Sequence, residues 1–185
     1  MSIRIGEKSR IELGDFFKAL YESGRNGLPE FKMYINGEWV SSETGETIDV
    51  DSPIDNSIVG RVAKAGTKDI EDAINSAYEN RKKSREMPAI DKLEIFEKAR
   101  ELLLQHKIEV ALTIVAELGK TVKAAESEVN ATAERLELAM EETRKIAGEY
   151  IPGDFVKDTI GKFAVVIREP LGVVAAISPF NYPLY

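Results

Sequence analysis

The chain has 185 residues, of which 43% are hydrophobic and 31% charged, as expected of a folded protein with one domain or one domain and part of a second. A formal net charge of -7 argues against a nucleic-acid partner, and no apolar run approaches the roughly 20 residues that a membrane-spanning helix requires. The absence of cysteine excludes a disulfide scaffold and a thiolate metal site, and charges near the start argue against a signal peptide, so we expect a cytoplasmic protein.

The first 30 residues contain one short amphipathic stretch. It runs from Leu13 to Leu20 and is followed by the helix breakers Gly24, Gly27 and Pro29. A stretch of this kind at a chain terminus predicts either a surface helix or a loosely held arm.

The next segment shows the turn signals and alternation of short β-strands. Asn36-Gly37, between two β-prone runs, is the strongest local signal for a hairpin. Residues 47–51 and 58–63 predict two further strands, which are separated by the turn formers Ser52, Pro53, Asp55 and Asn56. We therefore expect a small antiparallel sheet over residues 33–63.

Helical periodicity begins after this sheet. The first helix has an expected N-cap at Thr67 and an apolar face made of Ile70, Ala73, Ile74, Ala77 and Tyr78. The second runs from about residue 90 to residue 106. Its inward residues are expected to be Leu93, Phe96, Ala99 and Leu103.

Two more helices complete an expected helical layer. One covers residues 107–118 and ends at Gly119, a favourable C-cap. The other is long, from about residue 122 to residue 147, and ends at Gly148. Its buried stripe is predicted to consist of Val122, Ala125, Val129, Ala133, Leu136 and Met140.

The last 35 residues change character again. Residues 150–154 predict a turn, and residues 163–168 predict a strand that is exposed or only partly paired. Residues 171–177 are continuously apolar, as in a strand buried on both faces of a parallel sheet. Such a strand needs neighbours, which the few remaining residues cannot supply. We therefore expect an α/β fold, in which small antiparallel hairpins and a helical layer lead into the first strand of an incomplete, Rossmann-like parallel sheet.

Several motifs for other chemistries are incomplete. Gly119-Lys120-Thr121 lacks the upstream glycine of a phosphate-binding loop, because residue 114 is Ile, and no Gly-x-Gly-x-x-Gly follows the apolar run. His106 is the only histidine, so we assign it a structural role and expect no metal site. The basic cluster at residues 81–85 is expected at a helix end, where cations suit the helix dipole.

The residues after the apolar run form the main candidate site. Residues 178–184 follow the carboxyl end of the predicted strand, which is where open α/β sheets bind ligands. Two prolines fix the backbone, and Asn181 offers an amide donor between Phe180 and Tyr182, as an oxyanion hole requires. The alternative is an ordinary strand-to-helix turn in which Asn181 caps a helix. The residue types leave both interpretations open.

Residues 168–184 closely resemble the opening of the cofactor domain in the aldehyde dehydrogenase superfamily, in which a strand beginning Pro-x-Gly-Val leads into Pro-(Trp/Phe)-Asn-(Phe/Tyr)-Pro. Residues 35–39 and 52–62 resemble its first two hairpins. Residues 117–121, with Ala125 and Glu128-Val129 after them, resemble its Glu-x-Gly-Lys-(Pro/Thr) helix junction. Within the superfamily, residues 148–154 and 178–182 look most like the non-phosphorylating glyceraldehyde-3-phosphate dehydrogenases, especially archaeal ones, and the high Lys and Glu content is typical of thermophilic proteins.

The resemblance implies oxidation of an aldehyde to its carboxylic acid with NADP or NAD. The implied substrate is glyceraldehyde 3-phosphate, which gives 3-phosphoglycerate; another aldehyde or a semialdehyde is the alternative. Asn181 would donate to the oxyanion, and Tyr182 would line the aldehyde site. The cofactor cleft would be lined by Ile177, Ser178, Pro179 and Phe180. Arg135 is the candidate cation for the substrate phosphate, and its alternative role is a surface ion pair with Glu134 or Glu137.

The family's catalytic cysteine, water-activating glutamate and ribose-binding lysine are expected beyond residue 185. The chain alone is therefore expected to be inactive, and a non-catalytic module that assembles with other chains is the alternative. We divide the chain into an amino-terminal arm or surface helix (1–30), hairpins and helices of the cofactor domain (31–149), oligomerisation strands (150–168), and a first strand with the active-site loop (169–185). The expected partners are a small aldehyde and further copies of the chain in a homotetramer or dimer, without nucleic acid or membrane.

Overall fold

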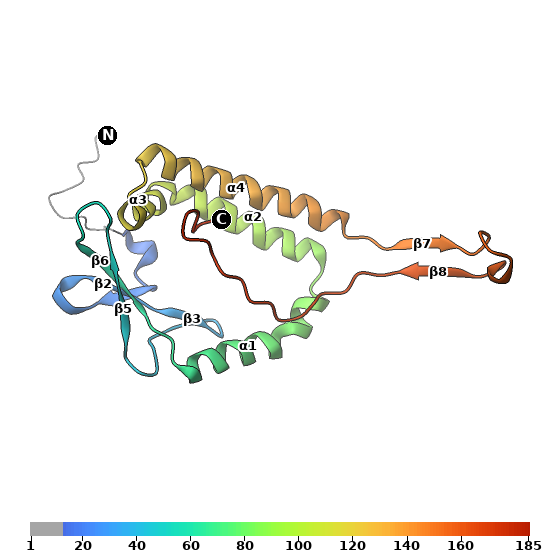
Figure 1. Ribbon diagram of the computed structural model, residues 1–185, viewed down its shortest axis with the longest axis horizontal. Coiled ribbons are helices and arrows are strands. Elements are labelled where there is room, and N and C mark those ends of the chain that lie inside the picture. The colour runs from blue at the N-terminus through green and yellow to red at the C-terminus, as the bar shows by residue number, and fades with distance from the viewer. Residues whose placement is uncertain (1–12) are drawn as a thin grey trace.

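The computed structural model describes residues 13–185, which form three small sheets beside a layer of four α-helices (Figure 1). The helices are α1 (Thr67–Glu86), α2 (Ala89–Gln105), α3 (Lys107–Leu118) and α4 (Val122–Lys145). The strands are β1 (Tyr21–Ser23), β2 (Pro29–Phe31), β3 (Met33–Ile35), β4 (Glu38–Val40), β5 (Thr47–Asp51), β6 (Ile58–Ala63), β7 (Glu149–Pro152) and β8 (Phe163–Val166). Single 3₁₀ turns lie at η1 (Asp15–Phe17), η2 (Arg25–Gly27) and η3 (Lys157–Thr159). The α/β class predicted from the sequence is confirmed.

The amino-terminal segment does not form the predicted surface helix. Within Leu13 to Leu20 only η1 is helical, as one 3₁₀ turn, and β1 then pairs antiparallel with β2. Long-range contacts decide this outcome: the Gly14 N–H donates to Glu109 Oε1 at 2.9 Å, and the ring of Phe16 stacks on His106 at a centroid distance of 4.1 Å. His106, between α2 and α3, therefore has the structural role that was expected. Residues 1–12 of the predicted arm lie outside the described residues.

The strands of residues 33–63 divide between two sheets, so the prediction of one antiparallel sheet is wrong. β3 and β4 form the expected hairpin, and Asn36 (φ 52°) and Gly37 (φ 86°) both have the positive φ that a tight two-residue hairpin turn requires. β5 and β6 pair antiparallel in a separate sheet with the order β1-β2-β6-β5. Because β2 joins β6 in parallel, this sheet is mixed.

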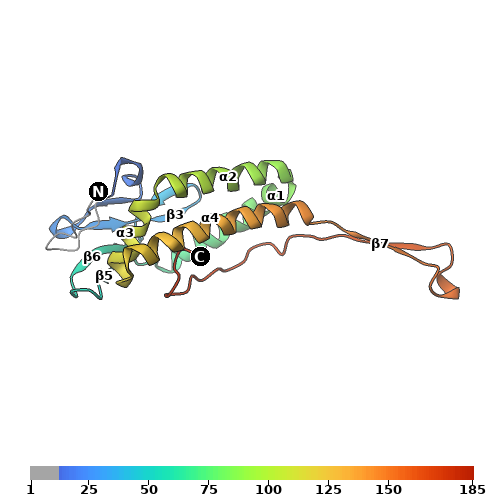
Figure 2. The same cartoon turned by 90° about the horizontal axis from the view of Figure 1, so that it is seen from above.

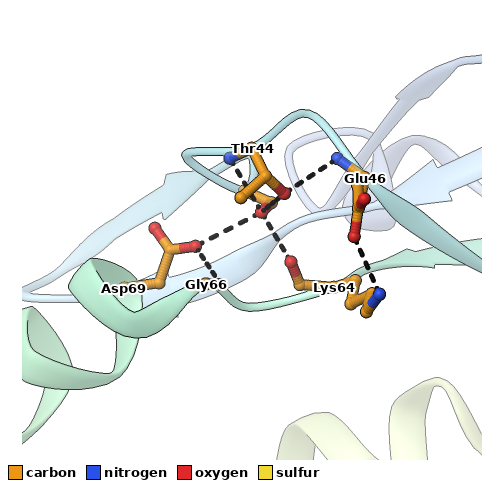
Figure 3. A network of polar contacts seen from close by, with 6 residues as sticks. Thr44, Glu46, Lys64, Gly66 and Asp69 are labelled. Atoms are coloured by element: carbon orange, nitrogen blue, oxygen red, sulfur yellow. Dashed lines mark hydrogen bonds and ion pairs between the residues drawn. The ribbon is translucent and has the colours of Figure 1, made fainter.

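The start of α1 is fixed by a carboxylate three residues inside the helix. The sequence predicts Thr67 as the N-cap, but Gly66 occupies that position. Asp69 Oδ2 accepts hydrogen bonds from the Gly66 N–H at 2.8 Å and from the Glu43 N–H at 3.1 Å, so that it also holds the β4–β5 loop to the helix. The Gly66 N–H foremost, and then the Glu43 N–H and the Ser42 hydroxyl, lower the pKa of Asp69. Figure 3 shows the Asp69 carboxylate joined to Gly66 at the start of the helix.

The hydrophobic core lies between α3 and α4. It consists of Ala111, Ile114, Val115, Ala125 and Val129. The predicted stripe of α4 is confirmed, since four of its six members are buried and the other two are half-buried. Gly119, with a φ of 66°, ends α3 as predicted. This short connection places α4 next to α3.

The predicted inward faces of α1 and α2 are only partly buried. Leu93 of α2 is buried and Phe96 is half-buried, but Ala99 is exposed, contrary to the prediction. On α1 the residues Ile70, Ile74 and Tyr78 are about half exposed, at 51%, 53% and 50%. The amphipathic spacing does place these apolar residues on one face of α1, but the face is exposed because no described element covers it along its length (Figure 1).

Residues 149–166 form a hairpin arm that extends away from the helices (Figures 1 and 2). The turn predicted at residues 150–154 is wrong for its first part, because β7 pairs antiparallel with β8 from Glu149 to Pro152. β8 was expected to be exposed or only partly paired, and it is exposed, with β7 as its described partner. The side chains of Tyr150 and Phe163 stack on each other and are both about two-thirds exposed.

The apolar run at residues 171–177 does not form the predicted buried strand. It has no regular secondary structure, and Leu171 and Ile177 are each 94% exposed. The physical reason is that a parallel strand gains its hydrogen bonds from neighbours, and residues 13–185 contain none beside it. Within the same residues, no helix combines the length and the apolar character needed to cross a membrane.

Candidate active site

The last residues return to the helical layer and form a turn at its α3–α4 junction (Figures 1 and 2). The Tyr185 N–H donates to the Tyr182 carbonyl at 3.2 Å and closes the turn. Leu184 packs against the α3–α4 core. The residues after the open apolar run are therefore docked, although the run itself is not.

Two charged residues hold this turn. Lys120 lies between Gly119, which ends α3, and Thr121, whose side chain caps α4. Its Nζ donates to Glu128 Oε2 at 2.6 Å and to the carbonyl of Asn181 at 2.6 Å. The other carboxylate oxygen of Glu128 accepts from the Leu184 N–H at 3.1 Å. The Glu128 carboxylate thus contacts both the residue that holds Asn181 and the far end of the turn.

The aromatic residues of the turn stack beneath cations. Lys120 Nζ lies 4.1 Å from the centre of the Tyr182 ring, which stacks on Tyr185 at 4.9 Å. The guanidinium of Arg135 lies 3.8 Å from the centre of the Tyr185 ring. Arg135 and Tyr182 are therefore on the same side of the helical layer, connected through Tyr185.

Asn181 is exposed, and residues 182–185 form a turn rather than a helix. Both interpretations of Asn181, oxyanion donor and helix cap, therefore stay predictions. Its carbonyl is anchored by Lys120 and the residue itself is exposed, so the backbone of the turn fixes the Cα–Cβ bond from which the amide extends.

The residues expected to contact a dinucleotide lie next to this turn. The segment from Ile177 through Ser178 and Pro179 to Phe180 is extended and exposed, with Ile177 at 94% and Phe180 at 85%. Apolar side chains and free backbone suit one wall of a cofactor cleft. Residues 13–185 do not enclose a dinucleotide there, so the remaining walls would have to come from elsewhere.

A cavity of about 260 Å³ lies behind the turn. It is lined mainly by apolar residues of the amino-terminal segment and α3, together with Pro183 and Leu184. Glu117 also lines it, and although part of this side chain is exposed, its apolar surroundings desolvate the carboxyl and raise its pKa.

Lys120 and Glu128 were not predicted as site residues. A sequence signal existed, because Glu128 interrupts the apolar stripe of α4 between Ala125 and Val129, and a charged residue at a core position calls for a partner. The sequence could not show that partner, since 61 positions separate Lys120 from Asn181 and 56 separate Glu128 from Leu184.

Known proteins are similar to this chain. The D-glyceraldehyde dehydrogenase (NADP⁺) of Thermoplasma acidophilum is 32% identical over 82% of this chain and 30% of its own length. The mitochondrial succinate-semialdehyde dehydrogenase of Arabidopsis thaliana is 34% identical over 86% of the chain and 29% of its own length. The crystal structure of NADP-dependent glyceraldehyde-3-phosphate dehydrogenase from Bacillus halodurans C-125, complexed with NADP, superposes with a TM-score of 0.77 at 35% identity, covering 83% of this chain and 33% of that one.

The chain thus spans about 30% of the length of the curated relatives it matches. The model of the aldehyde dehydrogenase family matches residues 39–185, which includes both the helix junction around Lys120 and the turn around Asn181. The chain belongs to the aldehyde dehydrogenase family.

Proposed function

We propose that the full-length protein containing this chain oxidises an aldehyde to its carboxylic acid with NADP or NAD. The observation that carries the proposal is the exposed Asn181 amide, on a turn anchored to the α3–α4 junction in a chain of this family. An amide donor on a fixed backbone stabilises the negative charge that develops on the carbonyl oxygen when a nucleophile adds. The chain contributes this donor.

The nucleophile must come from outside these residues. The chain contains no cysteine, so it cannot form the covalent adduct that the family resemblance implies. We infer that the part of the protein beyond this chain supplies the thiolate and the water-activating carboxylate. When bound, the nicotinamide cofactor accepts the hydride. The role of residues 177–180 would be to form one apolar wall beside it.

We propose glyceraldehyde 3-phosphate as the substrate. The similarity to a D-glyceraldehyde dehydrogenase and to a glyceraldehyde-3-phosphate dehydrogenase supports a three-carbon aldehyde, in the second case with a phosphate. A phosphate needs a cation, and Arg135 lies over Tyr185 on the side of the helical layer where the turn docks. A semialdehyde is the second candidate, favoured by the similarity to the succinate-semialdehyde dehydrogenase, because its carboxylate would suit the same cation.

Steady-state kinetics with the full-length protein tests the substrate. We expect glyceraldehyde 3-phosphate to exceed unphosphorylated glyceraldehyde and succinate semialdehyde in kcat/KM, and Arg135→Gln to reduce that advantage. Equal kcat/KM for glyceraldehyde and its phosphate would refute the phosphate assignment, and a preference for succinate semialdehyde would favour the second candidate.

A non-catalytic module that assembles with other chains is the alternative from a different class. The reading frame after residue 185 distinguishes the two. A continuing frame with a Gly-Gln-x-Cys-type loop supports the enzyme, whereas a stop codon supports the module.

A further inference from the structure

The turn that carries Asn181 is held through one buried carboxylate. Glu128 is 2% exposed, and its two oxygens serve different partners: Oε2 accepts from Lys120 and Oε1 from the Leu184 N–H. Lys120 completes the connection by donating to the Asn181 carbonyl. The two ends of the turn are therefore tied to the same side chain.

Burying this carboxylate among apolar side chains costs free energy of folding. Glu128 lies on the apolar face of α4 between Ala125 and Val129, each of which is fully buried. A charge there must be paired and hydrogen-bonded, and an apolar residue of similar size would complete the core without that requirement. Helix packing therefore does not explain Glu128, whereas its two contacts to the turn do.

Lys120 and Glu128 themselves lie on backbone that the fold holds in place. Lys120 is confined between the left-handed Gly119 and the N-cap Thr121, and Glu128 lies within α4. Because the Asn181 side chain is exposed, the backbone of the turn fixes the Cα–Cβ bond from which its amide extends. Fixing the Asn181 carbonyl and the Leu184 amide fixes that backbone.

We propose that Lys120 and Glu128 are positioning residues, which hold the turn in the geometry at which the Asn181 amide meets the developing oxyanion. This proposal rests on the proposed function. Neither residue contacts the reacting atoms. Their effect passes through Asn181, which distinguishes positioning from a simple contribution to stability.

A double-mutant cycle in the full-length protein tests the proposal. Lys120→Met is expected to lower kcat by about 10- to 100-fold, the scale of a small displacement of a catalytic group, with little change in the KM for the cofactor. In an Asn181→Ala background the same change should have almost no further effect on kcat, because the group it positions is gone. Lys123→Met, exposed in the first turn of α4 and three residues from Lys120, is the matched control and should retain wild-type kcat.

A second measurement does not depend on activity. Glu128→Gln preserves the size of the side chain but weakens its hold on two donors, so the Leu184 amide should exchange its hydrogen at least about 10-fold faster. Glu134→Gln, exposed on α4, is the control and should leave that exchange rate unchanged. Lys120→Gln, which removes the charge but keeps a polar side chain, replaces Lys120→Met in the cycle if the latter does not fold.

The outcomes separate the two proposals. If Asn181→Ala retains full kcat, the proposed function of Asn181 is wrong and the positioning role is wrong with it. Suppose that Asn181→Ala lowers kcat. If the Lys120 variant then has a wild-type kcat, or if it lowers kcat by the same factor in the Asn181→Ala background as in the wild type, only the positioning role is overturned. Unchanged exchange at Leu184 in Glu128→Gln also overturns it.

Discussion

In Asn181 the backbone carbonyl and the side-chain amide have separate proposed roles. Its carbonyl is used by Lys120, and its exposed amide remains available to a ligand. We expect Asn181→Ala in the full-length protein to lower kcat by about 10²–10³-fold, because the donor is needed most when negative charge has formed on the oxygen. KM for the cofactor should change little.

The melting temperature of the same variant provides the contrast. If the exposed Asn181 side chain acts as an oxyanion donor, its removal should leave stability within about 0.5 kcal/mol of wild type, whereas loss of a helix cap would cost about 1 kcal/mol. A variant with a lowered melting temperature and normal kcat would contradict a catalytic role and would indicate a structural one.

Asp69 predicts a pH dependence of stability. Its pKa is lowered in the folded state, chiefly by the Gly66 N–H, so its stabilising effect is fully present above the unfolded pKa of about 3.9 and is lost as the pH falls through the lower folded value. We expect Asp69→Asn to reduce the urea midpoint at pH 7. The gap to wild type should narrow as the pH falls below about 4.

Urea unfolding at a series of pH values between 7 and about 2 measures this gap, and the range spans the unfolded pKa of aspartate. Asp72→Asn, exposed on the same helix, is the control and should keep a midpoint close to wild type. A constant gap between Asp69→Asn and wild type at all pH values would mean that the Asp69 contacts do not depend on its charge.

At the scale of elements, the connection between α3 and α4 depends on Gly119. Its φ is 66°, and a Cβ at this position would meet Pro53 Cγ at 3.2 Å. Gly45 has nearly the same φ, 67°, with nothing within 4 Å of such a Cβ. We expect Gly45→Ala to cost about 1–2 kcal/mol, the cost of a left-handed L-residue, and Gly119→Ala to cost more because the proline ring cannot rotate away.

Urea unfolding of both variants under identical conditions compares the two costs. The difference between them isolates the contact with Pro53, because the backbone strain is matched. If Gly119→Ala is no less stable than Gly45→Ala, Pro53 moves aside and the close approach is unimportant.

Elements with local signals were predicted correctly. The hairpin at Asn36-Gly37, the end of α3 at Gly119 and the stripe of α4 each depend on residues within one or two turns of each other. Elements that depend on distant partners were not. Leu13 to Leu20 has helical spacing, but its contacts with α3 and the pairing of β1 with β2 prevail. Residues 171–177 have the composition of a buried strand without neighbours to bury them.

The candidate site divides in the same way. Two prolines around Asn181 and Tyr182 mark a rigid loop in the sequence itself. The anchoring by Lys120 and Glu128 joins residues more than 50 positions apart, and no local pattern contains such information. The sequence therefore pointed to Asn181 as the donor, which stays a prediction, and only the structure revealed what anchors its turn.

At the scale of the whole molecule, the β7–β8 arm exposes apolar side chains and free strand edges. Within residues 13–185 each of its strands has one unpaired edge, and Phe163 and Val165 are 65% and 60% exposed. An exposed apolar edge of this kind favours pairing with another chain. We propose that the full-length protein is a homotetramer or dimer in which this arm contacts another subunit.

Multi-angle light scattering of the full-length protein tests this arrangement. Val165→Lys, which places a charge on the arm, should reduce the measured mass to that of a smaller assembly or a monomer. Leu138→Lys, on an equally exposed part of α4, should leave the mass unchanged. A wild-type protein with the mass of a single chain would contradict the proposal.

Docking of the turn depends on the earlier folding of the helices that carry its contacts. α2, α3 and α4 are consecutive, and their contacts close short loops, whereas docking the turn joins positions 56 to 61 apart. Closing a loop of that length costs about 3–4 kcal/mol in chain entropy, and nothing compensates for this cost until Glu128 and Lys120 are already fixed by their helices. We therefore expect Asn181 to take its place only in molecules whose helical layer has formed.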